Sequence, residues 1–289
     1  MSRVVVLGDV MVDVVVRLSR PLARASDAPA TIRFHGGGSA ANTAAWLAAV
    51  GAGPALVGRV GRDERGRGAI EELRAGGVDA RPAVDPELPT GTCLVLVGSD
   101  GERTMAPDPG ANDALKEGDL EDELLQAADH LHVAGYALLR PGSRPAAKAA
   151  IRRALKSGIS VSVDPSSSAL LSPAFLDWAA GAGLLLPNAP EAQALTGEGD
   201  PERAARKLAE RFGEVVVTLG PDGALWTDGG DVVRAAAVPV EAVEDSTGAG
   251  DAFAAGLLSD RLAGAASADA LAAGCELAAR AVSTAGARP

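Results

Sequence analysis

The feature that most constrains this chain of 289 residues is a repeated alternation of short β-branched runs with longer Ala/Leu-rich segments. The runs that predict strands are Val4–Leu7, Leu56–Val60, Leu131–Ala134, Ile159–Val163, Leu184–Leu186 and Val215–Leu219. The segments with helical spacing are Asn42–Val50, Glu64–Ala75, Arg144–Ser157 and Pro201–Phe212. Such alternation with nearly continuous apolar strands is typical of a mostly parallel sheet covered on both faces. We therefore expect an α/β fold with three layers, α/β/α.

Two stretches depart from this alternation and predict strands without helices between them. One pairs residues 13–17 with 30–34, and the other pairs residues 92–97 with 103–106 around a turn at Ser99-Asp100-Gly101. We expect a small antiparallel flap, drawn from about residues 12–35 and 90–108, within a single domain that spans residues 1–289. Because ligands of open α/β sheets bind beyond the carboxyl ends of the strands, this flap is well placed to act as a lid.

Charge and composition exclude several classes of function. The net charge is −11, which disfavours nucleic acid as a partner because that binding depends on Lys and Arg neutralising phosphates. The two cysteines, Cys93 and Cys275, have no metal-binding or disulfide spacing. No apolar stretch reaches the ~18 residues that a membrane span requires, and no basic-then-apolar leader precedes the first strand. We expect a cytoplasmic protein that does not bind membranes.

The segment 244–253, with the sequence EDSTGAGDAF, leads into a helical pattern over residues 252–262. Small residues at Gly248, Ala249 and Gly250 let backbone amides face outward at a helix start, where free N–H groups and the helix dipole favour an anion. Asp251 beside such a site can accept a proton from an attacking hydroxyl. An equally simple alternative is that Asp251 is the N-cap of the helix.

A second segment, 36–44 with the sequence GGGSAANTA, precedes another predicted helix. Its glycines permit positive φ and close backbone approach, and Asn42 can offer both a donor and an acceptor to a polyol. The alternative is a flexible turn with Asn42 as a helix cap. Neither segment matches the P-loop or the dinucleotide fingerprint, because a GxxxxGK[ST] run is missing and Gly248-Ala249-Gly250 lacks a third glycine.

Together, the order and spacing of these segments resemble the two signatures of the PfkB carbohydrate kinase family, whose best-known member is ribokinase. DSTGAGDAF is similar to the C-terminal motif of that family, and the glycine-rich segment is similar to its N-terminal sugar-site motif. Gly8-Asp9, Asp13, Thr90-Gly91 and Gly110-Ala111-Asn112 resemble further family elements. The resemblance implies a ribokinase-like fold with a small β lid, and ATP-dependent phosphorylation of a primary hydroxyl of a small sugar.

The resemblance also implies roles for individual residues. Asp251 would be the catalytic base, with Gly248, Ala249 and Gly250 as the anion hole, and the sugar would contact Asp13, Gly38, Ser39, Asn42 and Asp251. ATP would contact Asn188, Thr218, Gly220, Gly223 and Gly250. Glu191, in an Asn188-Ala189-Pro190-Glu191 element, would act on Mg²⁺ through water. A monovalent cation, K⁺, would lie near Asp245, Thr247, Ala281, Thr284 and Gly286. For Asn188 and Glu191 a helix cap followed by a first-turn acid is the structural alternative.

Some positions depart from ribokinase. Met11, Ser39 and Tyr136 stand where ribokinase has polar ribose contacts, and Cys275 stands where it has an Asn near the adenine base. These departures weaken ribose as the substrate without weakening the assignment as a kinase. We expect a small sugar as substrate, with a nucleoside as the alternative, since the GGSAAN form also resembles the nucleoside kinases. A non-catalytic ligand-binding regulator on the same scaffold is a further alternative. The resemblance also suggests a homodimer formed through the lid.

Overall fold

A computed structural model describes residues 3–22, 25–98 and 103–289. The body is built on a nine-stranded sheet in the order β15-β14-β13-β12-β11-β10-β1-β4-β6. Its strands are β1 (Arg3–Leu7), β4 (Gly53–Val57), β6 (Asp79–Ala80), β10 (His130–Ala134), β11 (Ser160–Asp164), β12 (Leu184–Leu185), β13 (Glu214–Thr218), β14 (Ala224–Thr227) and β15 (Val232–Ala235). All neighbours pair in parallel except β13–β14 and β14–β15. The predicted mostly parallel sheet is confirmed.

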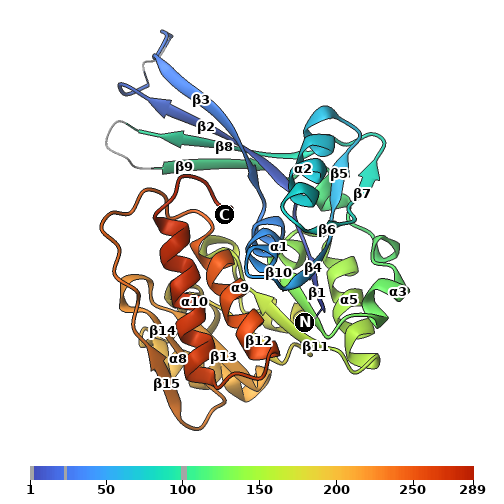
Figure 1. The fold of residues 1–289 in the computed structure, drawn as a ribbon, viewed down its shortest axis with the longest axis vertical. Coiled ribbons are helices and arrows are strands. Elements are labelled where there is room, and N and C mark those ends of the chain that lie inside the picture. Colours follow the sequence, from blue (N-terminus) through green and yellow to red (C-terminus); the bar gives the residue numbers. More distant parts are fainter. Residues whose placement is uncertain (1–2, 23–24, 99–102) are drawn as a thin grey trace.

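Helices cover both faces of this sheet, which completes the predicted three layers (Figure 1). One face carries α1 (Ser39–Ala49), α2 (Glu64–Ala75), α9 (Ala249–Leu262) and α10 (Ser267–Val282). The other carries α3 (Asp122–Gln126), α4 (Tyr136–Leu139), α5 (Arg144–Lys156), α6 (Phe175–Trp178), α7 (Ala189–Thr196) and α8 (Pro201–Phe212). Strand side chains alternate between the two faces, so the sheet separates two hydrophobic cores. No helix in the described ranges is long and apolar enough to cross a bilayer.

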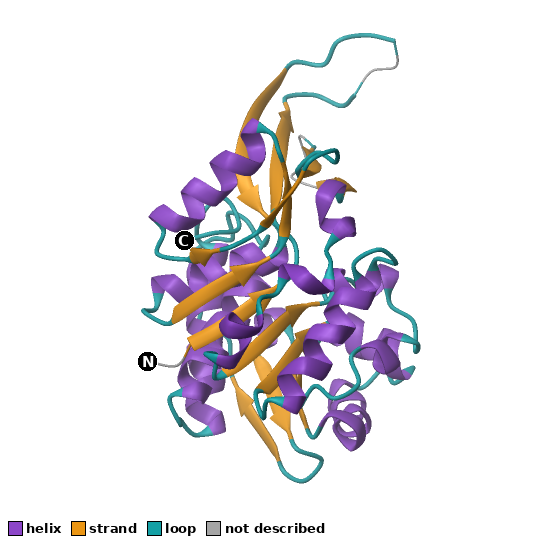
Figure 2. Cartoon of the chain, turned by 90° about the vertical axis from the view of Figure 1, so that its right-hand side faces the viewer, coloured by secondary structure: helices purple, strands orange, loops and turns teal. Residues whose placement is uncertain are grey.

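The lid is a separate four-stranded sheet in the order β3-β2-β8-β9, and it stands above the body in both views (Figures 1 and 2). Its strands are β2 (Met11–Leu18), β3 (Ala30–Gly37), β8 (Gly91–Val97) and β9 (Arg103–Asp108). The expected all-antiparallel flap is wrong at its centre, because β2 pairs with β8 in parallel. Both strands leave the body at the same end, where Met11 lies opposite Gly91. The expected turn at residues 99–101 lies outside the described residues.

Three predicted elements have different boundaries in the structure. The single strand expected over residues 56–60 is divided into β4 and β5 (Arg59–Gly61), and β5 pairs with β7 (Ala83–Asp85) in a small sheet. The break falls at Gly58, where an added Cβ would lie 2.6 Å from the carbonyl oxygen of Gly8. The 252–262 helix begins earlier, at Ala249, and the 42–50 helix begins at Ser39. Both helices thus start within the glycine-containing motifs.

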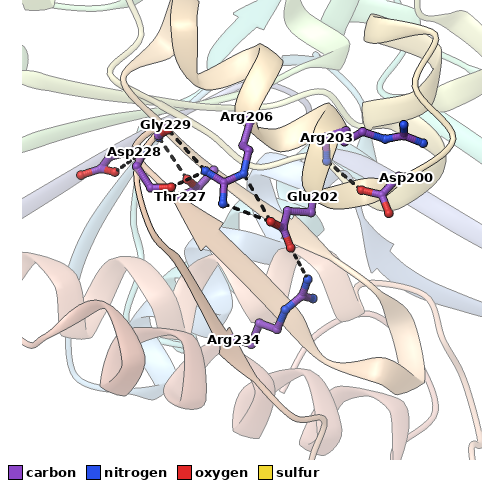
Figure 3. Close-up of polar contacts among 9 residues, drawn as sticks. Asp200, Glu202, Arg203, Arg206, Thr227, Asp228, Gly229 and Arg234 are labelled. Atoms are coloured by element: carbon purple, nitrogen blue, oxygen red, sulfur yellow. Dashed lines mark hydrogen bonds and ion pairs between the residues drawn. The ribbon is translucent and has the colours of Figure 1, made fainter.

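Short 3₁₀ turns connect several elements, and the antiparallel edge of the sheet is tied to a helix by charge. The turns are η1 (Gly110–Ala114), η2 (Glu117–Asp119), η3 (Ser168–Leu170) and η4 (Gly220–Asp222). At the edge, Glu202 of α8 accepts hydrogen bonds from Arg206 at 3.1 Å and from Arg234 of β15 at 2.8 Å (Figure 3). These side chains are partly exposed, so solvent screens the ion pairs and each contributes little to stability. This network serves the fold and lies apart from the cavity described next.

Candidate active site

A cavity of about 350 Å³ lies where the carboxyl ends of the central strands face the lid. Most of the predicted substrate, base and nucleotide residues meet there: Asp13, Gly38, Ser39, Asn42, Asn188, Glu191, Thr218, Thr247, Gly248, Gly250 and Asp251. The lid contributes Cys93, Met105 and Pro107. Parallel α/β sheets bind ligands at this edge, because the loops after each strand converge there. The sequence motifs therefore gather into one pocket.

Asp251 lies in the first turn of α9, and its carboxylate is held by side chains from α1. Ser39 Oγ donates to Asp251 Oδ1 at 2.7 Å, and Asn42 Nδ2 donates to Asp251 Oδ2 at 2.9 Å. Burial raises the pKa of Asp251 to about 8, helped by the negative charges of Asp164 and Asp9 and opposed by these two hydrogen bonds. A carboxyl group with a pKa close to neutral pH suits a general base.

The start of α9 lines the cavity beside this carboxylate through Gly248 and Gly250, whereas Ala249 does not line it and its amide donates to the carbonyl oxygen of Ser246 at 3.4 Å. Gly248 is the N-cap residue with φ 78°, and an added Cβ would lie 2.6 Å from the carbonyl oxygen of Ala287. An added Cβ at Gly250 would have no atom within 4 Å, so the cavity side of this turn is open. The first amides of a helix have no partner within the helix and attract anions. Interpreting Asp251 as the N-cap is wrong, because Gly248 occupies that position.

The glycine-rich segment is a rigid junction rather than a flexible turn. Gly37 ends β3, and Gly38 is the N-cap of α1 with φ 93°, where a Cβ would lie 2.5 Å from the carbonyl oxygen of Asp9. Asn42 is buried inside α1 and does not cap it, so that alternative is also wrong. Arg288 Nε donates to Asn42 Oδ1 at 3.2 Å, which leaves Asn42 Nδ2 directed at Asp251.

The end of the cavity where the sequence predicts sugar binding contains two buried carboxyl groups, Asp9 and Asp13. Burial raises the pKa of Asp13 to about 6, although the positive charge of Arg288 opposes that rise. Hydroxyl groups of a ligand can donate to such carboxylates. Met11 and Tyr136 line the same space and supply apolar surface, while Cys275 lies buried in α10 and outside the cavity. The departures from ribokinase at Met11 and Tyr136 thus fall within the pocket.

The end of the cavity where the sequence predicts ATP contains a capped helix and a second pair of carboxyl groups. Asn188 Oδ1 accepts from the amide of Glu191, and Glu191 Oε2 accepts from the amide of Asn188, both at 2.9 Å. This capping box confirms the structural alternative for these residues, and both side chains still line the cavity. Burial raises the pKa of Glu191 and of Asp164. The negative charge of Asp164 raises the pKa of Glu191 further, and the negative charge of Asp9 raises that of Asp164.

This donor set fits a magnesium ion that is held mainly by phosphate oxygens and water. Within residues 3–22, 25–98 and 103–289, no three His, Cys, Asp or Glu side chains converge closely enough to hold a metal alone. Mg²⁺ binds through few carboxylates and keeps several waters. Burial raises the pKa values of Asp164 and Glu191 because it disfavours their negative charge. A cation bound beside these two carboxylates would offset that charge.

Two predicted nucleotide residues lie outside the cavity. Thr218 lines it and forms a parallel bridge with Asn188, whereas Gly220 and Gly223 do not line it. Gly223 has φ 90°, and a Cβ there would lie 2.0 Å from the carbonyl oxygen of Ala235, so the β13–β14 turn requires glycine. An ATP contact at these two glycines stays a prediction.

The residues predicted for K⁺ lie around a second cavity of about 330 Å³ that adjoins the first at Asp13 and Thr247. Asp245, Thr247 and Gly286 line it, while Ala281 and Thr284 do not. The side chains of Asp245 and Thr247 are bonded to Arg103 of the lid strand β9. A cationic side chain therefore stands beside the predicted ligands.

Among the polar lining residues that sequence reasoning missed, three carry a charge that bears on the site. Asp164 and Arg140 line the first cavity, and Arg103 lines the second. Asp164 directly follows the apolar run of β11, so the rule that ligands bind at carboxyl ends of strands could have found it. Arg140 and Arg103 belong to no motif, and their positions depend on tertiary folding.

Comparisons with known proteins agree with this geometry. The sequence model of the pfkB family carbohydrate kinases matches residues 1–289. The chain is 36% identical over 262 residues to an ATP-dependent ribose-1-phosphate kinase of Halopiger xanaduensis, which covers 89% of this chain and 84% of that protein.

Solved structures with the same fold include two kinases. The adenosine kinase of Sinorhizobium meliloti has a TM-score of 0.90 and 28% identity, with 100% of this chain and 96% of that chain covered. A ribokinase II from E. coli, described as putative and solved with ATP and Mg²⁺, has a TM-score of 0.88 and 25% identity, with 99% and 94% covered. The match over the whole sequence, together with a site that gathers both motifs, shows that this chain belongs to the pfkB family of carbohydrate kinases, which are ATP-dependent phosphotransferases.

Proposed function

We propose that the protein transfers the γ-phosphoryl group of ATP to a primary hydroxyl of a furanose-sized sugar, with Asp251 as the general base. The observation that carries this proposal is the position of Asp251, which lies in the first turn of α9 and lines the cavity together with Gly248 and Gly250. The carboxylate would accept the hydroxyl proton as the oxygen attacks phosphorus. Ser39 and Asn42 hold it in one orientation.

The amides at 248–250 would stabilise the charge that develops on the transferred phosphoryl group. The αL conformation of Gly248 turns the chain so that α9 begins beside the carboxylate. Preorganised N–H donors at such a point are among the largest contributions to catalysis. Met105 and Pro107 of the lid cover the cavity, and this cover would limit hydrolysis of ATP by water.

ATP would lie at the end of the cavity lined by Asn188, Glu191 and Thr218. Mg²⁺ supplied with ATP would offset phosphate charge, with Glu191 and Asp164 as its nearest carboxylates. K⁺ stays a prediction, and the contacts of its expected ligands are taken up below.

The substrate we favour is a pentose or ketohexose, because Asp9 and Asp13 can accept hydrogen bonds from ring hydroxyls. A nucleoside is the second candidate, favoured by the apolar surfaces of Met11 and Tyr136 and by the likeness to an adenosine kinase. A phosphorylated sugar is supported by Arg140, the one cationic side chain among the described residues of this cavity, and by the ribose-1-phosphate kinase of Halopiger.

An ATP-consumption assay over free pentoses, ketohexoses, ribose-1-phosphate and nucleosides tests this proposal. We expect activity on at least one sugar, and we expect Tyr136→Ala to reduce activity on nucleosides far more than on sugars. If kcat/KM for a nucleoside exceeded kcat/KM for every sugar by about a hundredfold, equal to ~2.7 kcal/mol of transition-state binding, the substrate would be a nucleoside and not a sugar. Ligand binding without ATP turnover on any of these compounds would favour the regulator instead.

A further inference from the structure

Arg103 reaches from the lid to the loop that precedes α9. Its guanidinium forms an ion pair with Asp245, and its Nη1 donates to Thr247 Oγ1 at 2.6 Å. The side chains of Arg103 and Asp245 are 23% and 14% exposed, so the pair is largely shielded from water. These contacts join two parts of the chain that lie 142 residues apart.

The other groups expected to hold K⁺ are also engaged within the protein. Asp245 Oδ1 accepts from the amide of Thr247 at 2.8 Å, and Asp245 Oδ2 accepts from the amide of Gly286 at 3.2 Å. The carbonyl oxygen of Ala281 accepts from the amide and hydroxyl of Thr284, each at 3.2 Å. A potassium ion needs oxygen ligands, whereas Gly286 directs its N–H donor at this place. The arrangement therefore suits a carboxylate paired with a guanidinium better than a bound K⁺.

The ion pair acts on the loop that forms the proposed anion hole. Asp245 fixes the amide of Thr247, and Thr247 directly precedes Gly248, whose φ of 78° sets the direction of the first turn of α9. Burial alone would raise the pKa of Asp245, but hydrogen bonds from Thr247, Arg103 and Gly286 hold it below its usual value. The carboxylate thus stays charged, and the Arg103 charge balances it.

Two other arginines of the lid serve as internal comparisons. Arg17 and Arg33 face the same second cavity as Arg103 from the neighbouring strands β2 and β3. Neither forms an ion pair or a side-chain hydrogen bond within the part of the chain that the structure describes, in contrast to Arg103. The contact with Asp245 is therefore specific to Arg103 and does not follow from positive charge on this face in general.

We propose that Arg103 is a positioning residue that takes the place of a monovalent cation. The lid brings its guanidinium to Asp245, and this charge orients the loop whose amides receive the phosphoryl group. The inference rests on the proposed phosphoryl transfer at Asp251. Two consequences follow: the wild-type enzyme needs no K⁺, and closure of the lid and order in the anion hole depend on the same ion pair.

The test measures kcat, KM and melting temperature in potassium chloride and in choline chloride at matched ionic strength. The proteins are the wild type, Arg103→Ala, and the controls Arg17→Ala and Arg33→Ala. We expect the wild type and both controls to have equal kcat in the two salts. Arg103→Ala should lose kcat by on the order of tenfold or more in choline, as expected when anion-hole donors are misplaced. Potassium should restore part of that loss and raise the melting temperature of this variant alone, because an ion that binds only the folded state stabilises it.

Three results would overturn the proposal. One is strong stimulation of the wild type by potassium, which would support the K⁺ site predicted from the sequence. Another is an Arg103→Ala variant that is folded but not rescued by potassium. The third is an Arg103→Ala variant that behaves like Arg17→Ala. A wild type without activity in either salt would instead refute the proposed function, and the potassium shift in melting temperature would still decide the role of Arg103.

Discussion

The side chain of Asp251 receives hydrogen bonds from Ser39 and Asn42, and both bonds favour its charged form. Burial opposes them and raises the pKa of Asp251 to about 8. A base must be ionised to accept a proton, so kcat/KM should rise with pH, reach about half of its plateau near pH 8 and level off only above that pH. The pH dependence of kcat/KM reports ionisation in the free enzyme and measures this directly.

The Ser39→Ala variant provides the control for that prediction. Removing the Ser39 hydroxyl removes one donor to the carboxylate, which should raise the pKa of Asp251 and move the rising limb to higher pH. If the pH at which kcat/KM rises were the same in Ser39→Ala as in the wild type, another group, such as Glu191, would control the pH dependence. The melting temperature at each pH separates ionisation from unfolding.

Single residues that a motif fixes come together in the structure as the sequence predicts, whereas contacts that depend on tertiary folding could not be predicted. Asp251, Gly248 and Gly250 are brought to one cavity because their spacing alone sets the start of a helix. The partners of Asp251 come from α1, more than 200 residues away, and only folding brings them together. Arg103 was missed because a lone arginine on a lid strand carries no pattern. Its role depends on the loop at Asp245.

At the scale of elements, the first turn of α9 requires glycine at 248 for two separate reasons. Gly248 has φ 78°, and its added Cβ would lie 2.6 Å from the carbonyl oxygen of Ala287. Gly264, which follows the other end of α9, has φ 87° but no atom within 4 Å of an added Cβ. Both Gly→Ala changes should cost ~1–2 kcal/mol of backbone strain. Only Gly248→Ala should also displace the anion-hole loop and lower kcat by at least tenfold.

Unfolding free energies and kcat values of these two variants check the prediction. Gly264→Ala should be less stable than the wild type and fully active. An equally active Gly248→Ala variant would mean that the position of this turn does not limit phosphoryl transfer. A Gly264→Ala variant that lost activity to the same degree would assign the effect to general destabilisation of α9.

The elements themselves were predictable to different degrees. Helices Glu64–Ala75 and Pro201–Phe212 match their predicted ranges, because each carries its own N-terminal cap, Asp63 or Asp200. The parallel pairing of β2 with β8 was not predicted, because strand direction depends on where the chain re-enters the lid after the body. The early starts of α1 and α9 were missed because glycine normally weakens a helix, whereas here Gly38 and Gly248 are the caps.

At the scale of the whole molecule, the lid exposes an apolar face away from the body. Ile32, Phe34 and Leu94 lie on this outer face and are 57%, 63% and 39% exposed. Exposed apolar patches of this kind mark interaction sites, and the resemblance to ribokinase suggests a second copy of the chain as partner. We predict a dimer in solution, and Phe34→Asp should convert it to a monomer.

Light scattering coupled to size-exclusion chromatography measures the molar mass in solution and so distinguishes a dimer from a monomer. Leu155→Asp is the matched control, because Leu155 is 44% exposed on α5 of the body. The control should remain dimeric. A monomeric wild type, or loss of the dimer in both variants, would reject the lid as the dimer interface.

The central claim is that Asp251 is the general base, and Asp251→Asn tests it most directly. Asparagine keeps the size of the side chain and can still bond to Ser39 and Asn42, but it cannot accept the hydroxyl proton. The control is Asp260→Asn, a change from the same residue type near the far end of α9. We predict that kcat of Asp251→Asn falls by on the order of 10² to 10⁴, while ATP binding, melting temperature and the control stay close to wild type. An Asp251→Asn enzyme that retained more than half of the wild-type kcat would contradict the account.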